Sequence, residues 1–218
     1  MLVVVGLLAG AVSARASSVT VGAVTGINCA PFLCSPSFSV NRYQQVYSAG
    51  AFGTTDPLLI TGLTFATVFG SGSFGDSTFA VSLSTTSASV QGLSFNMDDN
   101  VGADNALFWS GTLSGPVGPA LSLSGGPFLY DPMAGNLLMD VTIAGGTAQY
   151  VFQSEDDSGT VTSRMFSNGT VYADEAGLVT EFTYTIQPPP APVPEPTTLA
   201  LLAAGLAGAR RLKRRFPA

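Results

Sequence analysis

The sequence contains no histidine, and only two of its 218 residues are cysteines. Without histidine the chain lacks the most common general base of enzymes. With two cysteines and no histidine it also lacks the ligands for a zinc or iron site. We therefore expect no catalytic residues of these kinds, and a protein that is not an enzyme.

Neighbouring carboxylates are the remaining catalytic alternative. They occur as Asp98 with Asp99, in residues 155–157, and as Asp174 with Glu175. Such pairs supply the acid and the base of glycosidases. Adjacent acidic residues followed by Gly or Asn are, however, typical of solvated turns, which is the interpretation we favour.

Positive charge is nearly absent from the middle of the chain. Arg15 lies near the start, and five basic residues lie at the end: Arg210, Arg211, Lys213, Arg214 and Arg215. Between them, Arg42 and Arg164 stand against thirteen acidic residues, a net charge of -11. Such a surface repels phosphate backbones, so we expect no nucleic-acid partner.

Long hydrophobic runs are missing as well, and the first apolar run, residues 2–12, is too short to span a bilayer. It is followed by Ala14-Arg15-Ala16, the small-x-small pattern cut by signal peptidase. We predict a signal peptide at residues 1–16, cleaved after Ala16, and export by the Sec machinery. A basic stretch before the run is lacking, and a buried first strand or helix is the less favoured alternative.

Export places the two cysteines in an oxidising compartment. Cys29 and Cys34 are separated by four residues, and we expect them to form a structural disulfide rather than two free thiols. The gain in stability for so short a loop is on the order of 2 kcal/mol.

Residues 17–186 read as short alternating segments separated by turn signals. Leu63, Phe65, Thr67 and Phe69 share one face of such a segment, and Phe79, Val81 and Leu83 share one face of the next. Residues 137–143 and 182–186 repeat the pattern. We predict an all-β domain, an antiparallel two-sheet sandwich with jelly-roll-like topology and little helix. Asn168-Gly169 predicts a hairpin with a two-residue primed turn, in preference to a glycosylated Asn-x-Thr site.

One acidic turn is a weak candidate for calcium, because Asp98, Asp99, Asn100, Asp104 and Asn105 lie close together in the sequence. Their spacing does not match an EF-hand loop, and a plain surface turn is favoured. Phe108, Trp109, Phe128 and Tyr130 are aromatic candidates for a sugar-stacking platform, although aromatics in strands more often belong to the core.

After residue 186 the composition changes. Residues 187–193 are rich in proline and predict a stiff spacer. Residues 197–209 form an uncharged apolar run of ~20 Å as a helix, against ~30 Å of hydrocarbon. We therefore predict a marginal, transient membrane anchor. Its basic end at residues 210–215 stays in the cytoplasm, while the all-β domain of residues 17–186, called the body below, stays outside.

Pro194-Glu195-Pro196, followed by this apolar run and closed by Arg210-Arg211, resembles the PEP-CTERM sorting signal of Gram-negative bacterial surface proteins. The resemblance covers residues 194–218. It implies recognition and processing by an exosortase near Pro194 to Pro196, and an association with exopolysaccharide or biofilm.

Two functions fit these observations. The first is a non-enzymatic surface or matrix protein that is exported, briefly anchored and sorted by exosortase. The second is an extracellular glycan-binding module of the β-sandwich, for which calcium is a candidate cofactor.

Overall fold

The computed structural model of the protein describes residues 15–69 and 72–187, which form antiparallel β-sheets joined by loops and short 3-10 helices. Within these two ranges no α-helix occurs, in line with the expected scarcity of helix. In chain order the elements are β1 (Ser17–Val21), β2 (Gly26–Asn28), β3 (Arg42–Tyr47), η1 (Ala49–Phe52), β4 (Leu58–Ala66), β5 (Ser73–Thr86), η2 (Met97–Asn100), β6 (Ala106–Pro116), β7 (Ala120–Tyr130), β8 (Asn136–Ile143), β9 (Thr147–Gln149), β10 (Gln153–Asp156), β11 (Thr162–Ser167), β12 (Val171–Asp174), β13 (Gly177–Leu178) and β14 (Thr180–Ile186).

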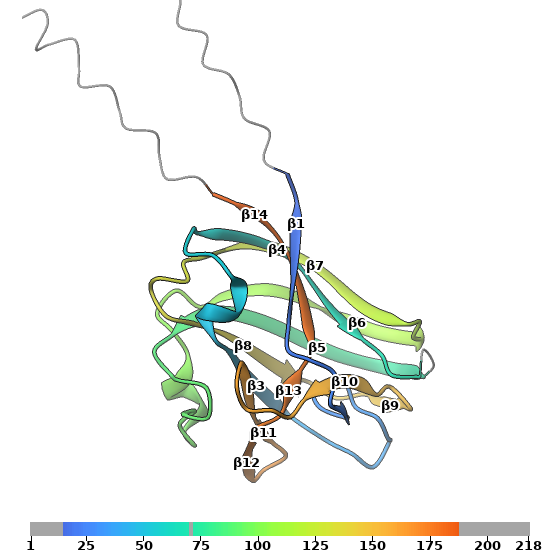
Figure 1. Ribbon diagram of the computed structural model, residues 1–218. Coiled ribbons are helices and arrows are strands. Elements are labelled where there is room, and N and C mark those ends of the chain that lie inside the picture. Colours follow the sequence, from blue (N-terminus) through green and yellow to red (C-terminus); the bar gives the residue numbers. More distant parts are fainter. Residues whose placement is uncertain (1–14, 70–71, 188–218) are drawn as a thin grey trace, which may run out of the picture. The chain divides into compact units, whose positions relative to one another are not determined.

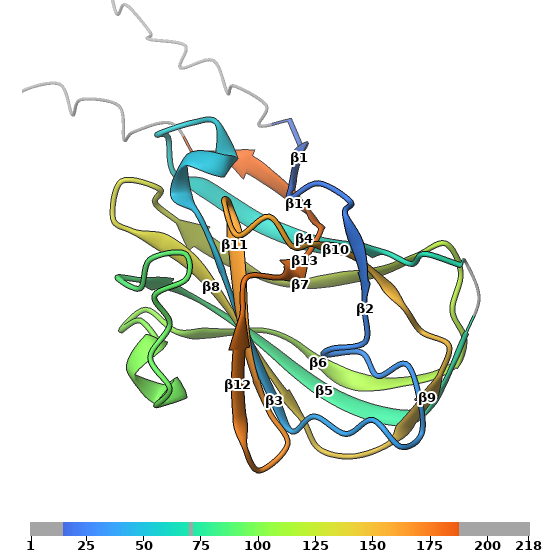
Figure 2. The same cartoon turned by 60° about the horizontal axis from the view of Figure 1, so that its bottom comes forward.

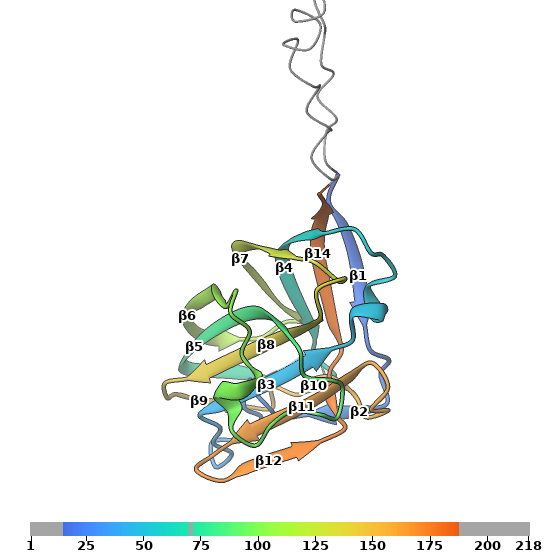
Figure 3. The same cartoon turned by 90° about the vertical axis from the view of Figure 1, so that its left-hand side faces the viewer.

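Eight of these strands form two sheets in jelly-roll order. The smaller sheet has the order β1-β14-β4-β7, and the larger sheet contains the run β3-β8-β5-β6. The chain therefore passes repeatedly from one sheet to the other, as two Greek keys require. Figure 3 shows the two layers, with β7, β4, β14 and β1 above and β6, β5, β8 and β3 below. The predicted all-β jelly-roll sandwich is confirmed.

The remaining strands enlarge one side of this framework. β11 and β12 continue the large sheet past β3, as Figure 2 shows, and β9 pairs with β5. β13, β10 and β2 form a third, small sheet. The buried Gln45 of β3 joins this sheet to the large one, because its side chain donates to the Leu178 carbonyl at 2.9 Å and accepts from the Leu178 N–H at 2.7 Å.

The alternating sequence pattern places the core as expected in most strands. Phe79, Val81 and Leu83 of β5 are buried, as are Leu63 and Phe65 of β4. The side chains of Thr67 and Phe69 were expected on the same buried face. Thr67 is buried, but Phe69 is 59% exposed because β4 ends at Ala66 and the alternation stops there.

Aromatic side chains hold the two sheets together. The ring of Tyr47 in β3 and the ring of Phe182 in β14 are 4.9 Å apart in an edge-to-face contact, which joins the two sheets of the sandwich. Phe52 of η1 packs at 5.1 Å from Phe182 and 5.0 Å from Tyr130, filling one end of the core. Edge-to-face pairs of this kind add about 0.5–1.5 kcal/mol beyond the burial of their area.

The outer face of the large sheet is covered by residues 87–105, the connection between β5 and β6. Gln44 of β3 is fully buried beneath it and donates to the Met97 carbonyl at 2.8 Å. Asn100, also buried, donates to the Gln44 side chain at 2.9 Å. This cover explains why Leu138 in β8 is buried although the alternation assigns it to the outer face.

The hairpin predicted at Asn168-Gly169 joins β11 and β12, but its turn differs from the prediction. Ser167 pairs with Val171, so three residues and not two form the loop. Gly169 has a φ of 106°, whereas Asn168 is not among the residues with positive φ, as a primed two-residue turn would require. The hairpin is confirmed, and the two-residue turn is wrong.

The body is entered and left at neighbouring points. β1 and β14 are antiparallel partners, and Ser17 at the start of β1 pairs with Tyr184 near the end of β14. Figure 1 shows the beginning of β1 and the end of β14 side by side.

We expect Phe182→Ala to lower the free energy of unfolding by about 3–5 kcal/mol, because it opens a cavity between the two sheets. Leu129→Ala is the matched control, since Leu129 is 58% exposed, and its effect should stay within about 0.5 kcal/mol. Urea unfolding of the two variants measures the difference. Equal losses in both would contradict the assignment of Phe182 to the centre of the core.

Candidate functional site

A hollow of about 260 Å³ lies between residues 91–95 and the β11–β12 hairpin. One wall is formed by Gln91, Leu93 and Phe95 of the covering segment. The other wall is formed by Ser163 and Arg164 of β11, by Ala173 and Asp174 of β12, and by Glu175, which follows β12. An aromatic ring, an amide, a hydroxyl and a carboxylate therefore line one opening in the surface.

The first wall is held at both ends by hydrogen bonds. The backbone N–H of Gln91 donates to Ser163 Oγ at 2.7 Å, and its side-chain amide donates to the Gly159 carbonyl at 2.8 Å. Ser94 and Asn100 exchange two further bonds, of 2.7 and 2.9 Å. Phe95, directly beside Ser94, nevertheless keeps 67% of its surface exposed. Its ring is thus displayed on an anchored segment.

The second wall rests on a cluster of ionised side chains. Arg164 donates through Nε and Nη2 to the two carboxylate oxygens of Asp174, at 2.8 and 2.9 Å, and its Nη1 lies 2.9 Å from Glu155 Oε1. The side chains of Arg164 and Glu155 are only 12% and 13% exposed. The guanidinium also lies 5.5 Å from the centre of the Phe166 ring. This cluster ties β10, β11 and β12 together, and two of its members, Arg164 and Asp174, also line the hollow.

Burial has a measurable consequence for Glu155. Removal from water raises the pKa of its carboxyl above the ordinary value, and the attraction of Arg164 offsets this only in part. Glu175, in contrast, is exposed and takes part in none of the ion pairs found in residues 15–69 and 72–187.

Arg42, the other basic residue of the body, is paired as well. It donates to both carboxylate oxygens of Asp140, at 3.0 and 2.7 Å, and to Asp98 at 2.6 Å. The pair with Asp98 ties the covering segment to β3.

The three carboxylates considered as calcium ligands, Asp98, Asp99 and Asp104, therefore each interact with a different partner in the protein. Asp98 pairs with Arg42, Asp99 accepts from the Asn96 amide at 2.8 Å, and Asp104 accepts from the Thr85 N–H at 2.8 Å. Within the described part of the chain, no group of three or more His, Cys, Asp or Glu side chains is arranged to hold a metal ion.

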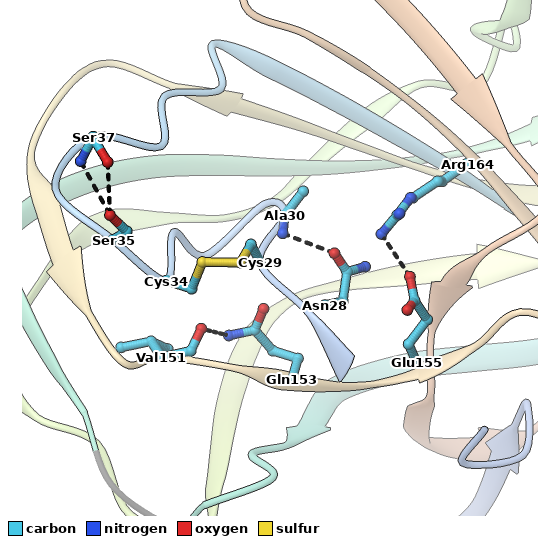
Figure 4. Close-up of a disulfide and its surroundings, with 10 residues drawn as sticks. All are labelled: Asn28, Cys29, Ala30, Cys34, Ser35, Ser37, Val151, Gln153, Glu155 and Arg164. Carbon is cyan, nitrogen blue, oxygen red and sulfur yellow. Dashed lines mark hydrogen bonds and ion pairs between the residues drawn. A yellow bond between two sulfur atoms is a disulfide. The ribbon is translucent and has the colours of Figure 1, made fainter. Parts of the chain in front are cut away.

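The predicted disulfide is present. Cys29 and Cys34 are bonded, with their Cα atoms 4.8 Å apart, and Figure 4 shows the bond beside Val151 and Gln153, the latter being the first residue of β10. The closed loop carries Phe32 into the core, where its ring lies 5.0 Å from that of Phe65. The carbonyl of Cys34 accepts from the Tyr150 N–H at 2.8 Å. The disulfide therefore supports the core and not a reactive site.

The aromatic residues considered for sugar stacking belong to the core. Phe108, Phe128 and Tyr130 are buried, and Trp109 packs against the same cluster. Sequence reasoning missed Phe95, whose signal was its position between Ser94 and Asn96 in a polar segment without strand alternation. An isolated aromatic in such a segment has no core face to join.

Several predicted sites lie outside the described residues: Ala14 with most of the signal peptide, the spacer after residue 187, Pro194, Glu195, Pro196, the helix at 197–209 and the basic cluster 210–215. Ala16, the other residue of the cleavage motif, directly precedes β1. Among the helices of the described ranges, none is long and apolar enough to cross a membrane.

Comparison with known families locates a match at the end of the chain. Residues 192–215 match the family described as the PEP-CTERM protein-sorting motif. The chain is a PEP-CTERM sorting-domain protein. Its motif makes it an exported cell-surface protein with exosortase as its processing partner.

The body of this PEP-CTERM protein has only loose likenesses. One is to the cysteine protease and lectin-like domains of Cwp84, a surface layer associated protein of Clostridium difficile, with 11% identity and a TM-score of 0.38 over 67% of this chain and 33% of that one. Another is to a structure of the infectious bursal disease virus Gx strain, with 13% identity and a TM-score of 0.28 over 97% of this chain and 53% of that one. The chain thus spans a third to a half of these structures. No curated protein matches the sequence.

The disulfide yields a prediction about stability. We expect the double variant Cys29→Ser, Cys34→Ser to unfold with a free energy lower by about 2 kcal/mol, because the unfolded chain gains the freedom of the opened loop. Wild-type protein in reductant should approach the variant, and the variant itself should not respond to reductant. A wild type that is fully reduced by thiol assay and unchanged in urea unfolding would contradict this.

Glu155 yields a prediction about pH. Because its pKa is raised by burial in the folded state, the folded protein binds this proton more tightly than the unfolded chain does. The free energy of unfolding of the wild type, relative to that of Glu155→Gln, should therefore rise as the pH falls from 7 towards 4.5, the ordinary pKa of a glutamate. This gain should disappear when the pH is raised again. Glu181→Gln, on β14, controls for the loss of any one carboxylate. A relative stability that falls on acidification is the opposite of this expectation.

Proposed function

We propose that this protein is a non-enzymatic component of the bacterial surface or extracellular matrix. Signal peptidase cleaves it after Ala16 during Sec export, and its apolar run at residues 197–209 holds it briefly in the membrane. Exosortase processes it near Pro194 to Pro196, and the body then associates with exopolysaccharide or biofilm. The match of residues 192–215 to the sorting motif is the observation that carries this proposal.

Two features of the body support this course. Ser17, the first residue of β1, lies beside the end of β14, so the segments that precede and follow the body leave it at neighbouring points. A body held by its end during sorting thus keeps the rest of its surface free for the polymer layer. The absence of histidine from the sequence supports a role without catalysis.

A second candidate function is glycan binding by the body. It is favoured by the hollow beside Phe95, where an exposed aromatic ring adjoins hydrogen-bonding side chains. Ligand sites commonly combine an apolar surface with a few such polar groups. The two functions are compatible, because a matrix protein needs a means of holding the matrix.

Replacement of Glu195 tests the sorting step. We expect Glu195→Ala to leave the protein unprocessed and to remove it from the cell surface, because the acidic centre of the Pro-Glu-Pro motif is lost. Surface labelling of cells and the size of the chain in membrane and medium fractions measure this. Glu181→Ala removes a carboxylate from the body and should be sorted as the wild type. Normal processing of Glu195→Ala would refute the assignment of the motif.

A further inference from the structure

The charge of the body restricts which polymer it can hold. Its two basic residues, Arg42 and Arg164, are each paired with two carboxylates, and Arg164, which lines the hollow, is only 12% exposed, so the charge of each is compensated within the protein. Eleven acidic charges in excess remain on residues 17–186. A polyanionic saccharide would meet repulsion that nothing in the described part of the chain compensates, since no carboxylate cluster there could hold a bridging metal ion.

The hollow has groups that suit the opposite charge. At one wall Glu175 presents an exposed carboxylate that forms no ion pair with any residue the structure describes. Phe95 presents its ring at the other, and the face of an aromatic ring attracts both the C–H edge of a sugar and a cation. Gln91 is exposed between them, and its backbone N–H is held by the buried Ser163, whose Oγ accepts at 2.7 Å.

From this arrangement we infer that the hollow between residues 91–95 and the β11–β12 hairpin binds a saccharide that carries a protonated amino group. The sugar ring packs on Phe95, the ammonium group faces Glu175, and ring hydroxyls bond to the exposed side chain of Gln91. The volume of about 260 Å³ is just below the ~300–1,000 Å³ of pockets for larger ligands, so it suits a single ring of a chain that continues into solvent. The inference rests on the proposed association of the body with extracellular polysaccharide.

Three oligosaccharides of equal length distinguish the ligand chemistry when titrated into the purified full chain: a glucosamine oligomer, its fully N-acetylated form and a uronic acid oligomer. The glucosamine oligomer alone should bind near neutral pH, and its affinity should fall with added salt, because exposed charges are screened over ~10 Å at 0.1 M. Tighter binding of the acetylated or the uronic acid oligomer would overturn the inference.

Variants place the binding at the hollow. Phe95→Ala should lower the affinity for the glucosamine oligomer about 5-fold. Glu175→Gln should lower it about 3-fold and make it less dependent on salt. The matched controls are Phe69→Ala, which removes another exposed ring, and Glu181→Gln, which removes a carboxylate from the small sheet. Both controls should bind as the wild type. If all four variants bind alike, the attraction comes from the overall charge and the assignment of this site fails.

Failure of this inference is distinguishable from failure of the proposed function. The amount of each variant retained in the extracellular polymer layer is measured in parallel with its affinity. Wild-type protein that is retained in the layer but binds no glucosamine oligomer refutes the inference alone. Wild-type protein that is sorted but never retained refutes the association with the polymer, and the inference with it.

Discussion

The body contains only two basic side chains, Arg42 and Arg164, and both form ion pairs with carboxylates of the body. Arg42 joins β3 to β8 through Asp140 and to the covering segment through Asp98. Arg164 joins β11 to β12 through Asp174 and to β10 through Glu155. Each guanidinium thus connects three segments; those joined by Arg42 are distant in sequence, whereas those joined by Arg164 are consecutive strands. A single exposed ion pair contributes little, but a partly buried cation with two carboxylates fixes geometry, because leaving either carboxylate without its partner is costly.

The covering segment, residues 87–105, is held to the large sheet in part by the ion pair between Arg42 and Asp98. Residues 87–105 contain no strand, yet they lie on the outer face of the large sheet through polar contacts of Gln44 and Asn100. A loop that buries polar groups must satisfy them within the protein, and here side chains from β3 do so. The hollow exists because this segment stands beside the β11–β12 hairpin, which the framework of eight strands does not require. Jelly-roll strands provide the platform, and the two additions create the site.

Features that depend on residues close together in the sequence could be predicted from the sequence. Alternation located β5, β8 and β14, the cysteine spacing predicted the disulfide, and the terminal motif identified the sorting route. Facts that depend on partners distant in sequence were out of reach. Nothing around Leu138 shows that a loop covers the outer face, and nothing around Asp98 shows that its carboxylate is taken by Arg42 instead of a metal ion. The turn at Asn168 failed for a similar reason, because the pairing of Ser167 with Val171 decides its length.

Sorting and binding place different demands on the chain, and the fold keeps them apart. The sorting motif requires only that the end of the chain be reachable, and β14 ends at the margin of the small sheet beside the start of β1. The hollow lies on the other sheet, between the β5–β6 connection and a hairpin inserted between β8 and β14. A ligand there contacts none of the strands from which the two terminal segments depart. Under the proposed function the same body is held by its end during processing and by its outer face afterwards, and the ligand inferred for that face is the one that its unpaired carboxylate attracts.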